Sequence, residues 1–168
     1  MTDAEARRVL TNVGLPAIEG AAIRLEALDE AGLSPLAPGD LSTDAVPGTY
    51  YKIGTWGAGD LVLHGGTGQI VLFGADDWSS AEDDFDAYFD DEPDDSGEQE
   101  TGAVLIAGSL AAFIDLLQHY LVARCMLAAA GNRTERVAIR DDLEDTLPGL
   151  DDADTATTFW TAALRTAD

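Results

Sequence analysis

The chain opens with apolar residues at helical spacing. Thr2 and Glu5 have the spacing of a capping box, which predicts a helix N-terminus there, and Gly14 would end that helix. Its apolar face would consist of Ala6, Val9, Leu10 and Val13. A second, weaker helical pattern covers residues 17–32, and the proline- and turn-rich stretch 34–48 predicts a loop.

From residue 49 to residue 73 the spacing of apolar residues changes to that of strands. Three runs of β-branched, aromatic and aliphatic residues are separated by two short glycine-containing turns. The runs are Tyr50–Ile53, Leu61–Leu63 and Ile70–Phe73. Because connections this short join antiparallel neighbours, the pattern predicts a three-stranded meander.

The second half of the chain predicts one more strand and three helices. Residues 103–107 have the composition of a strand, and Ser109 can cap a long helix. The apolar positions of that helix are Leu110, Phe113, Ile114, Leu117, Tyr120, Leu121 and Met126. Two further helices are expected over 133–147 and 155–167. Together these elements predict an α+β fold, with an antiparallel or mixed sheet of about four strands and helices packed on it.

Length and charge restrict the possible functions. The 168 residues, 46% of them hydrophobic, predict a single domain over residues 1–168 with a substantial core. Nine Lys and Arg residues stand against 32 Asp and Glu residues, which gives a net charge of −23. Binding to nucleic-acid phosphates or to an anionic membrane requires positive charge, so we expect no nucleic-acid partner and no membrane partner.

The single cysteine, the N-terminal residues and the longest apolar stretch together predict a location in the cytoplasm. The single cysteine, Cys125, cannot form an intramolecular disulfide, and it lies in an apolar run typical of a buried core residue in a reducing compartment. Asp3 and Glu5 lie where a signal peptide would carry basic residues. Polar and charged residues interrupt the longest apolar stretch, 103–131, which favours a core helix over a membrane span.

The sequence contains no convincing catalytic or metal-binding pattern. His64 and His119 lie on different predicted elements, so a catalytic pair would require distant elements to converge. A strand follows the glycines of Gly54–Gly68, so these glycines predict hairpin turns and no phosphate loop. The nearest approach to a calcium loop begins at Glu92 and lacks the carboxylate required at its twelfth position. We therefore expect no catalytic residue, no metal and no cofactor.

An acidic insertion occupies residues 76–101, after the third strand of the meander. From Asp76 to Glu100, 13 of 25 residues are acidic and none is Lys or Arg. Adaptation to a salty cytosol would spread acidic residues evenly, and this clustering favours a cationic partner instead. Aromatic residues are scarce in purely solvated segments, so Phe85, Tyr88 and Phe89 indicate anchoring or contact.

Two interpretations of the insertion remain open. It can act only as a solubilising segment. Alternatively, it is a recognition surface for a basic protein, whose electrostatic field raises association rates to about 10⁸–10⁹ M⁻¹s⁻¹ at low salt. The candidate partner-binding residues are Asp83, Asp84, Asp86, Tyr88, Asp90, Asp91, Asp94 and Asp95.

Five short segments, taken in order along the chain, resemble the SUKH superfamily, and the fourth, actinobacterial-type SUKH family is the most similar. They are Arg8–Pro16, Tyr50–Gly54, Asp60–Leu63, Gly68–Val71 and Ser109–Phe113. The resemblance implies an α+β fold and a non-catalytic immunity protein. Such a protein binds and blocks a polymorphic toxin, often a nuclease or a nucleic-acid deaminase.

The resemblance and the charge together predict a cytoplasmic immunity protein that neutralises a basic toxin through an acidic surface. One alternative is a regulatory binding module of the same fold with a client other than a toxin. Another is a small hydrolase or calcium-dependent protein that uses the clustered carboxylates.

Overall fold

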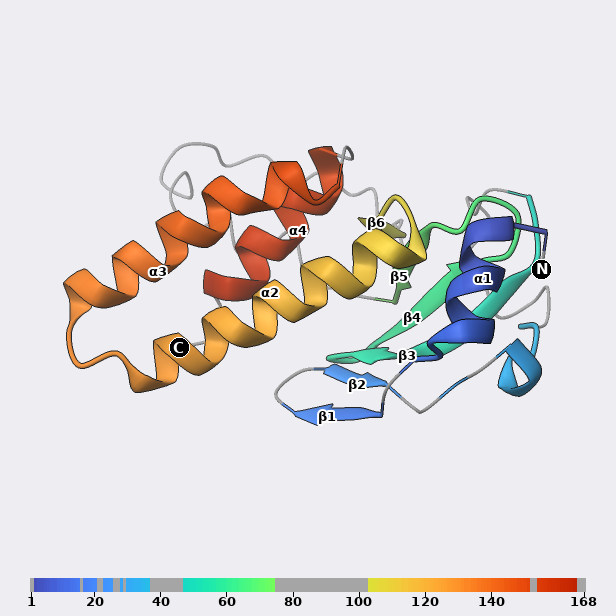
Figure 1. Ribbon diagram of the computed structural model, residues 1–168, viewed down its shortest axis with the longest axis horizontal. Coiled ribbons are helices and arrows are strands. Elements are labelled where there is room, and N and C mark those ends of the chain that lie inside the picture. The colour runs from blue at the N-terminus through green and yellow to red at the C-terminus, as the bar shows by residue number, and fades with distance from the viewer. Residues whose placement is uncertain are drawn as a thin grey trace, which may run out of the picture.

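The computed structural model describes residues 2–15, 17–20, 23–25, 28, 30–36, 47–74, 103–151 and 154–165. Their strands form one antiparallel six-stranded sheet in the order of the chain (Figure 1). The strands are β1 (Ile18–Gly20), β2 (Ile23–Leu25), β3 (Tyr50–Trp56), β4 (Gly59–His64), β5 (Ile70–Phe73) and β6 (Val104–Ala107). The helices are α1 (Ala4–Asn12), η1 (Glu30–Gly32), α2 (Leu110–Ala129), α3 (Arg133–Thr146), η4 (Leu147–Gly149) and α4 (Asp154–Arg165). This arrangement confirms the α+β class.

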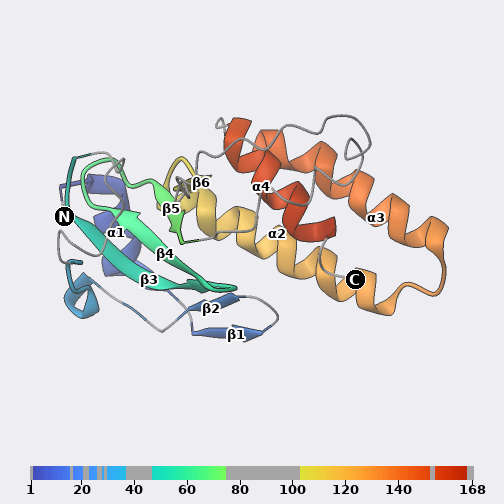
Figure 2. The ribbon, with the colours of Figure 1, turned by 180° about the vertical axis from the view of Figure 1, so that it is seen from behind.

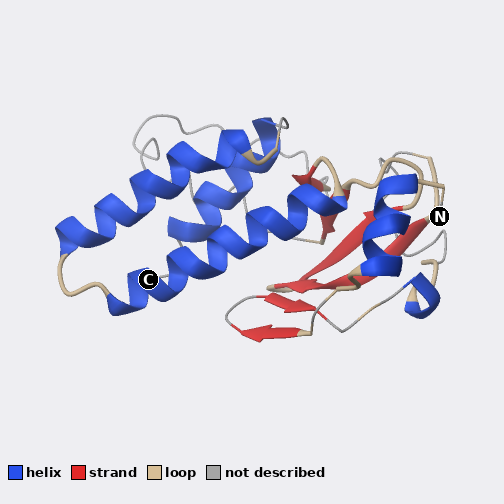
Figure 3. Cartoon of the chain, in the orientation of Figure 1, coloured by secondary structure: helices blue, strands red, loops and turns tan. Residues whose placement is uncertain are grey.

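The molecule has a sheet region and a helical region. The α1 helix lies in front of β3 and β4 in Figure 1 and behind them in Figure 2, so it covers one face of the sheet. The α2 helix starts beside the sheet, and its far half runs past the strands together with α3 (Figure 3). This extension leaves part of α2 without a sheet beneath it.

The predicted meander is confirmed as β3, β4 and β5. Gly57, with a φ of 58°, and Ala58 form the tight turn between β3 and β4. Such a turn favours glycine, because it requires a positive φ that other residues rarely adopt. The register shifts between Lys52 and Gly54, which marks a β-bulge in β3. The strand predicted over 103–107 is also confirmed, as β6 beside β5.

The sheet has six strands, where the sequence predicts about four. The helix predicted over residues 17–32 is wrong, and this region contributes two additional strands. Most of the described residues there form β1, β2 and the short helix η1. Ile23 and Leu25 are buried and Arg24 between them is exposed, a period of two that fits a strand. Ile23 pairs with Trp56, so β2 extends the meander at its β3 edge.

The helix predicted at the N-terminus exists, with a different cap. Asp3 caps α1, since its carboxylate accepts a hydrogen bond from the Ala6 backbone N–H at 2.6 Å. The Thr2 hydroxyl donates instead to the Gly65 carbonyl, which ties the start of α1 to the turn after β4. Val13 lies beyond the helix end and is 76% exposed, so its assignment to the apolar face is wrong.

The long helix α2 begins where the sequence predicts. The Ser109 hydroxyl accepts from the Ala112 backbone N–H at 3.1 Å. The side chains buried on α2 are Leu110, Phe113, Leu116, Leu117, Tyr120, Ala123 and Leu127. Met126 is half exposed and Cys125 is exposed, so their prediction as core residues is wrong. Both lie on the half of α2 that extends past the sheet, where fewer elements cover it.

The two last predicted helices are confirmed as α3 and α4, and α4 supplies the centre of the core. Trp160 is fully buried, and its ring lies near those of Trp56, Phe113, Tyr120 and Phe159, with centroid distances of 5.4, 6.2, 5.5 and 5.4 Å. Its indole N–H donates to the Ile106 carbonyl at 2.9 Å. This bond gives a carbonyl of the edge strand β6 a partner within the chain, which disfavours pairing with another protein's strand.

Candidate functional site

The candidate partner-binding residues, Asp83 to Asp95, lie outside the described residues. The structure places the two ends from which this acidic segment extends. The chain leaves the sheet after Phe73, at the end of β5, and returns at Val104, at the start of β6. These two strands are antiparallel neighbours, and Leu72 pairs with Val104. Both ends therefore lie at the same end of the sheet. Asp60 lies there too, because it pairs with Phe73.

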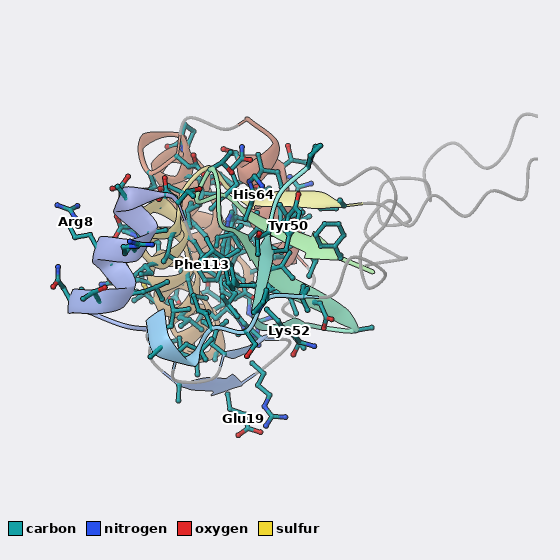
Figure 4. All side chains as sticks on the ribbon, turned by 90° about the vertical axis from the view of Figure 1, so that its right-hand side faces the viewer. Arg8, Glu19, Tyr50, Lys52, His64 and Phe113 are labelled. Carbon is teal, nitrogen blue, oxygen red and sulfur yellow. The ribbon has the colours of Figure 1, made fainter. Side chains whose placement is uncertain are left out.

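The sheet face that no described helix covers carries a small apolar cluster. Tyr50, Val62 and Phe73 are buried and pack with the partly buried Leu36 and Val71. The rings of Tyr50 and Phe73 meet edge to face with centroids 5.7 Å apart. In Figure 4, Tyr50 lies on the strands and Phe113 lies between the strands and the helices. The three buried residues come from β3, β4 and β5, so the cluster packs the meander strands together on this uncovered face.

His64 belongs to this face and has a structural role. It is 4% exposed, its Nδ1 lies 2.7 Å from the Thr67 hydroxyl, and its ring lies 4.8 Å from the Tyr50 ring. A Cβ on Gly48 would collide with the ring, so the neighbouring backbone packs directly against it. No hydrogen-bond partner for His64 Nε2 is found among the described residues. The histidine holds the turn after β4 in place.

The exposed part of the same face is polar and contains both signs of charge. Lys52 Nζ on β3 lies 2.5 Å from Asp60 Oδ1 on β4, and both side chains are nearly half exposed. Arg24 pairs in register with Glu19 on one side and with Thr55 on the other. Figure 4 labels both Lys52, on the inner strand β3, and Glu19, on the edge strand β1. Charges of both signs suit polar contacts with another protein.

A groove of about 460 Å³ lies beside these charges, next to the bulge in β3. Its lining is Arg24, Leu28, Gly32, Ser34, Pro35, Leu36 and Lys52–Thr55. Arg24 and Lys52 provide two cations in this groove, Ser34 and Thr55 provide two hydroxyls, and the backbone adds further polar groups. These groups can bind a polar chain, and they contain neither a histidine nor a carboxylate to act as a general base.

Metal and membrane interactions gain little support from the described part of the chain. No group of three or more His, Cys, Asp or Glu side chains is placed to hold a metal there. The α2 helix is long and apolar enough to span a membrane by length and composition alone. A core helix passes the same test, and one face of α2 is buried in the core, so this is weak evidence for a span.

Among the residues that the structure describes, Tyr120 is the titratable group whose pKa the fold clearly shifts. Burial raises the pKa of its phenol, and the nearby Arg124 guanidinium, whose Nη1 donates to the phenol oxygen at 3.4 Å, partly offsets that rise. The folded protein thus holds this proton more tightly than the unfolded chain does. The resulting stability is complete below pH of about 10 and is lost as the pH rises through the folded-state pKa.

Tyr120→Phe is therefore expected to flatten the loss of stability above pH of about 10. The free energy of unfolding of both proteins, measured in urea at several pH values from neutral to alkaline, tests this. Equal alkaline slopes for the two proteins would contradict the role of Tyr120.

A family model described as SUKH-4 immunity protein matches residues 1–166. The chain belongs to this family. No curated protein and no solved structure matches it. The match confirms the SUKH-4 resemblance of the five short segments and supports an immunity role for this chain.

Sequence reasoning did not identify the charged groups around the groove of this SUKH-4 protein. Lys52 and Asp60 are eight positions apart, and only the hairpin register brings their side chains together. Arg24 lies on a strand that the sequence pattern does not predict. The alternation of Ile23, Arg24 and Leu25 was the signal that could have located it.

Proposed function

We propose that this SUKH-4 protein binds a toxin, blocks its activity and catalyses no reaction itself. Membership of an immunity protein family is the observation that carries the proposal. The concentration of acidic residues within 76–101 supports a basic toxin. A nuclease or a nucleic-acid deaminase fits, because an enzyme that binds a polyanion needs cationic side chains around its substrate.

The acidic segment is proposed to be the main contact with the toxin. Carboxylates grouped on one segment repel each other, and a cationic surface relieves that repulsion on binding. Attraction at a distance also speeds capture, which matters when an active toxin must be stopped quickly. Tyr88 would add an aromatic contact, a residue type enriched where binding energy concentrates. The carboxylate contacts are assigned to Asp83, Asp84, Asp86, Asp90, Asp91, Asp94 and Asp95.

A survival assay tests the proposed function. A candidate toxin domain, taken from the genes that neighbour the one for this chain, is produced in a host cell with and without the SUKH-4 protein. We expect the host to survive only when both are present. An unrelated acidic protein of similar size and net charge is the control, and it should not protect. Equal killing with and without the SUKH-4 protein would overturn the proposal.

A further inference from the structure

The sheet has a gap on the β2 side of β3. The register of β2 against β3 ends with Leu25 opposite Gly54. Continued for three more residues, this register would place Leu28 opposite Tyr51, but Pro35 pairs with Tyr51 instead. In Figure 1, β2 lies beside one end of β3, and the light-blue η1 lies toward its other end, near α1. The chain therefore leaves β3 after β2 and returns to it at Pro35, which splits this edge.

Lys52 lies opposite the gap, and no described residue pairs with it on this edge of β3. In an antiparallel strand, the main-chain N–H and C=O groups of alternate residues point to the same edge. The Tyr50 carbonyl accepts a hydrogen bond from the Leu36 N–H at 2.8 Å on this edge, and the bulge begins only after Lys52. The main-chain N–H and C=O of Lys52 therefore point into the gap.

The groove of about 460 Å³ beside the bulge occupies this gap. Its lining combines residues that precede the gap, Arg24 and Leu28, with residues that follow it, Gly32 and Ser34–Leu36, and with Lys52–Thr55 of β3. No described Asp or Glu lines the groove, although the chain has a net charge of −23. A peptide in the groove would meet the main chain of β3 and two cationic side chains.

The two cations of the groove differ in what they already contact. Lys52 Nζ lies 2.5 Å from Asp60 Oδ1. Arg24 is exposed, and among the described residues its side chain has no ion pair. An ammonium group has three donors, so Lys52 can hold Asp60 and a second acceptor. The Arg24 guanidinium is the group that a carboxylate would bind first, through two parallel hydrogen bonds.

We propose that the gap binds one extended peptide segment of a partner protein, with a Glu or Asp side chain of that segment at Arg24. The peptide main chain would pair with the Lys52 N–H and C=O, as an added strand pairs with the edge of a sheet. The carboxylate would pair with the Arg24 guanidinium. A small anion would leave the Lys52 carbonyl unpaired, so the main-chain groups favour a peptide. This inference goes beyond the proposed function, because it needs neither the acidic segment nor a basic toxin.

A nuclear magnetic resonance titration of the full ¹⁵N-labelled chain tests the proposal. The probe is a five-residue peptide with blocked ends and a central glutamate, flanked on each side by valine and threonine. At about 0.15 M salt, where charges more than about 8 Å apart are largely screened, we expect a submillimolar dissociation constant. The amide signals of Lys52 and Thr55 should shift, and hydrogen exchange at the Lys52 amide should slow about tenfold at saturation.

Matched variants and peptides separate the groove from general attraction between charges. Arg24→Gln is expected to weaken binding about fivefold or more, and glutamine in place of the peptide's glutamate should have a similar effect. Arg8→Gln removes another exposed arginine, on α1, and should leave the affinity unchanged. Both variants should retain the far-UV circular dichroism of the parent, because both side chains are exposed.

Four results would each overturn the proposal. They are unchanged signals and exchange at the Lys52 amide, equal binding of the glutamine peptide, equal effects of Arg24→Gln and Arg8→Gln, and binding of free glutarate as tight as that of the peptide. The last result would assign the groove to a small anion.

One further variant tests whether the chain's own acidic segment occupies the gap. It replaces Asp83, Asp84, Asp86, Asp90 and Asp91 with asparagine. We expect its affinity for the peptide to stay close to that of the parent at about 0.15 M salt. Binding that is tenfold tighter would assign the gap to the acidic segment and would overturn the proposal as well. None of these results bears on survival in the toxin assay.

Discussion

Trp160→Ala is expected to lower the free energy of unfolding by about 3–5 kcal/mol. The side chain is fully buried, and four other aromatic rings surround it. Its removal leaves a large cavity and also removes the donor that pairs with the Ile106 carbonyl. Urea unfolding followed by far-UV circular dichroism measures the loss, since tryptophan fluorescence changes with the substitution itself.

Two variants show where the Trp160 effect originates. Trp160→Phe keeps an aromatic ring but has no indole N–H, so it should cost less than Trp160→Ala. Phe113→Ala, at a neighbouring fully buried position, should cost about 3–5 kcal/mol. A loss below about 1 kcal/mol for Trp160→Ala would contradict the packing of α4 against β6.

Neutralising the acidic segment is expected to slow capture of a basic toxin by about tenfold or more at low salt. The variant replaces Asp83, Asp84, Asp86, Asp90 and Asp91 with asparagine. The dissociation rate should change less than the association rate, because long-range attraction acts mainly on encounter. Folding stability should stay the same or rise slightly as repulsion is relieved. Stopped-flow association at several salt concentrations provides the rates.

A second variant with the same change in net charge is the control for this experiment. It neutralises five exposed acidic residues elsewhere, Glu19, Asp115, Asp141, Asp142 and Asp145, as glutamine or asparagine. Its association rate should change much less than that of the segment variant. Equal slowing by both variants would assign the effect to overall charge, and no slowing by the segment variant would refute its role.

The features of the fold that follow from local patterns were predictable. Tyr50 to Phe73 combine strand-forming residues with short turns, and Ser109 has a cap position before a continuous apolar helix, so both predictions are confirmed. The pairing of Ile23 with Trp56 depends on residues distant in sequence, and the short strand β2 gives a weak local signal. Local spacing alone therefore assigned that region to a helix.

The exposed surface of α2 was not predictable, for a physical reason. Apolar residues occur on all sides of this helix, so spacing cannot distinguish the buried Leu127 from the exposed Met126. Only the position of the sheet and of α3 decides which side is covered. The acidic segment was visible in the sequence because charge clustering needs no structure, and its residues lie outside those described.

The central claim is that this SUKH-4 protein stops a toxin by binding it. Titration of the purified toxin's catalytic activity with the purified protein tests the claim most directly. We expect activity to fall in proportion to added protein, to reach zero near one equivalent, and to return as salt weakens the complex. Full toxin activity in a tenfold molar excess of the protein, at low salt, would contradict the claim.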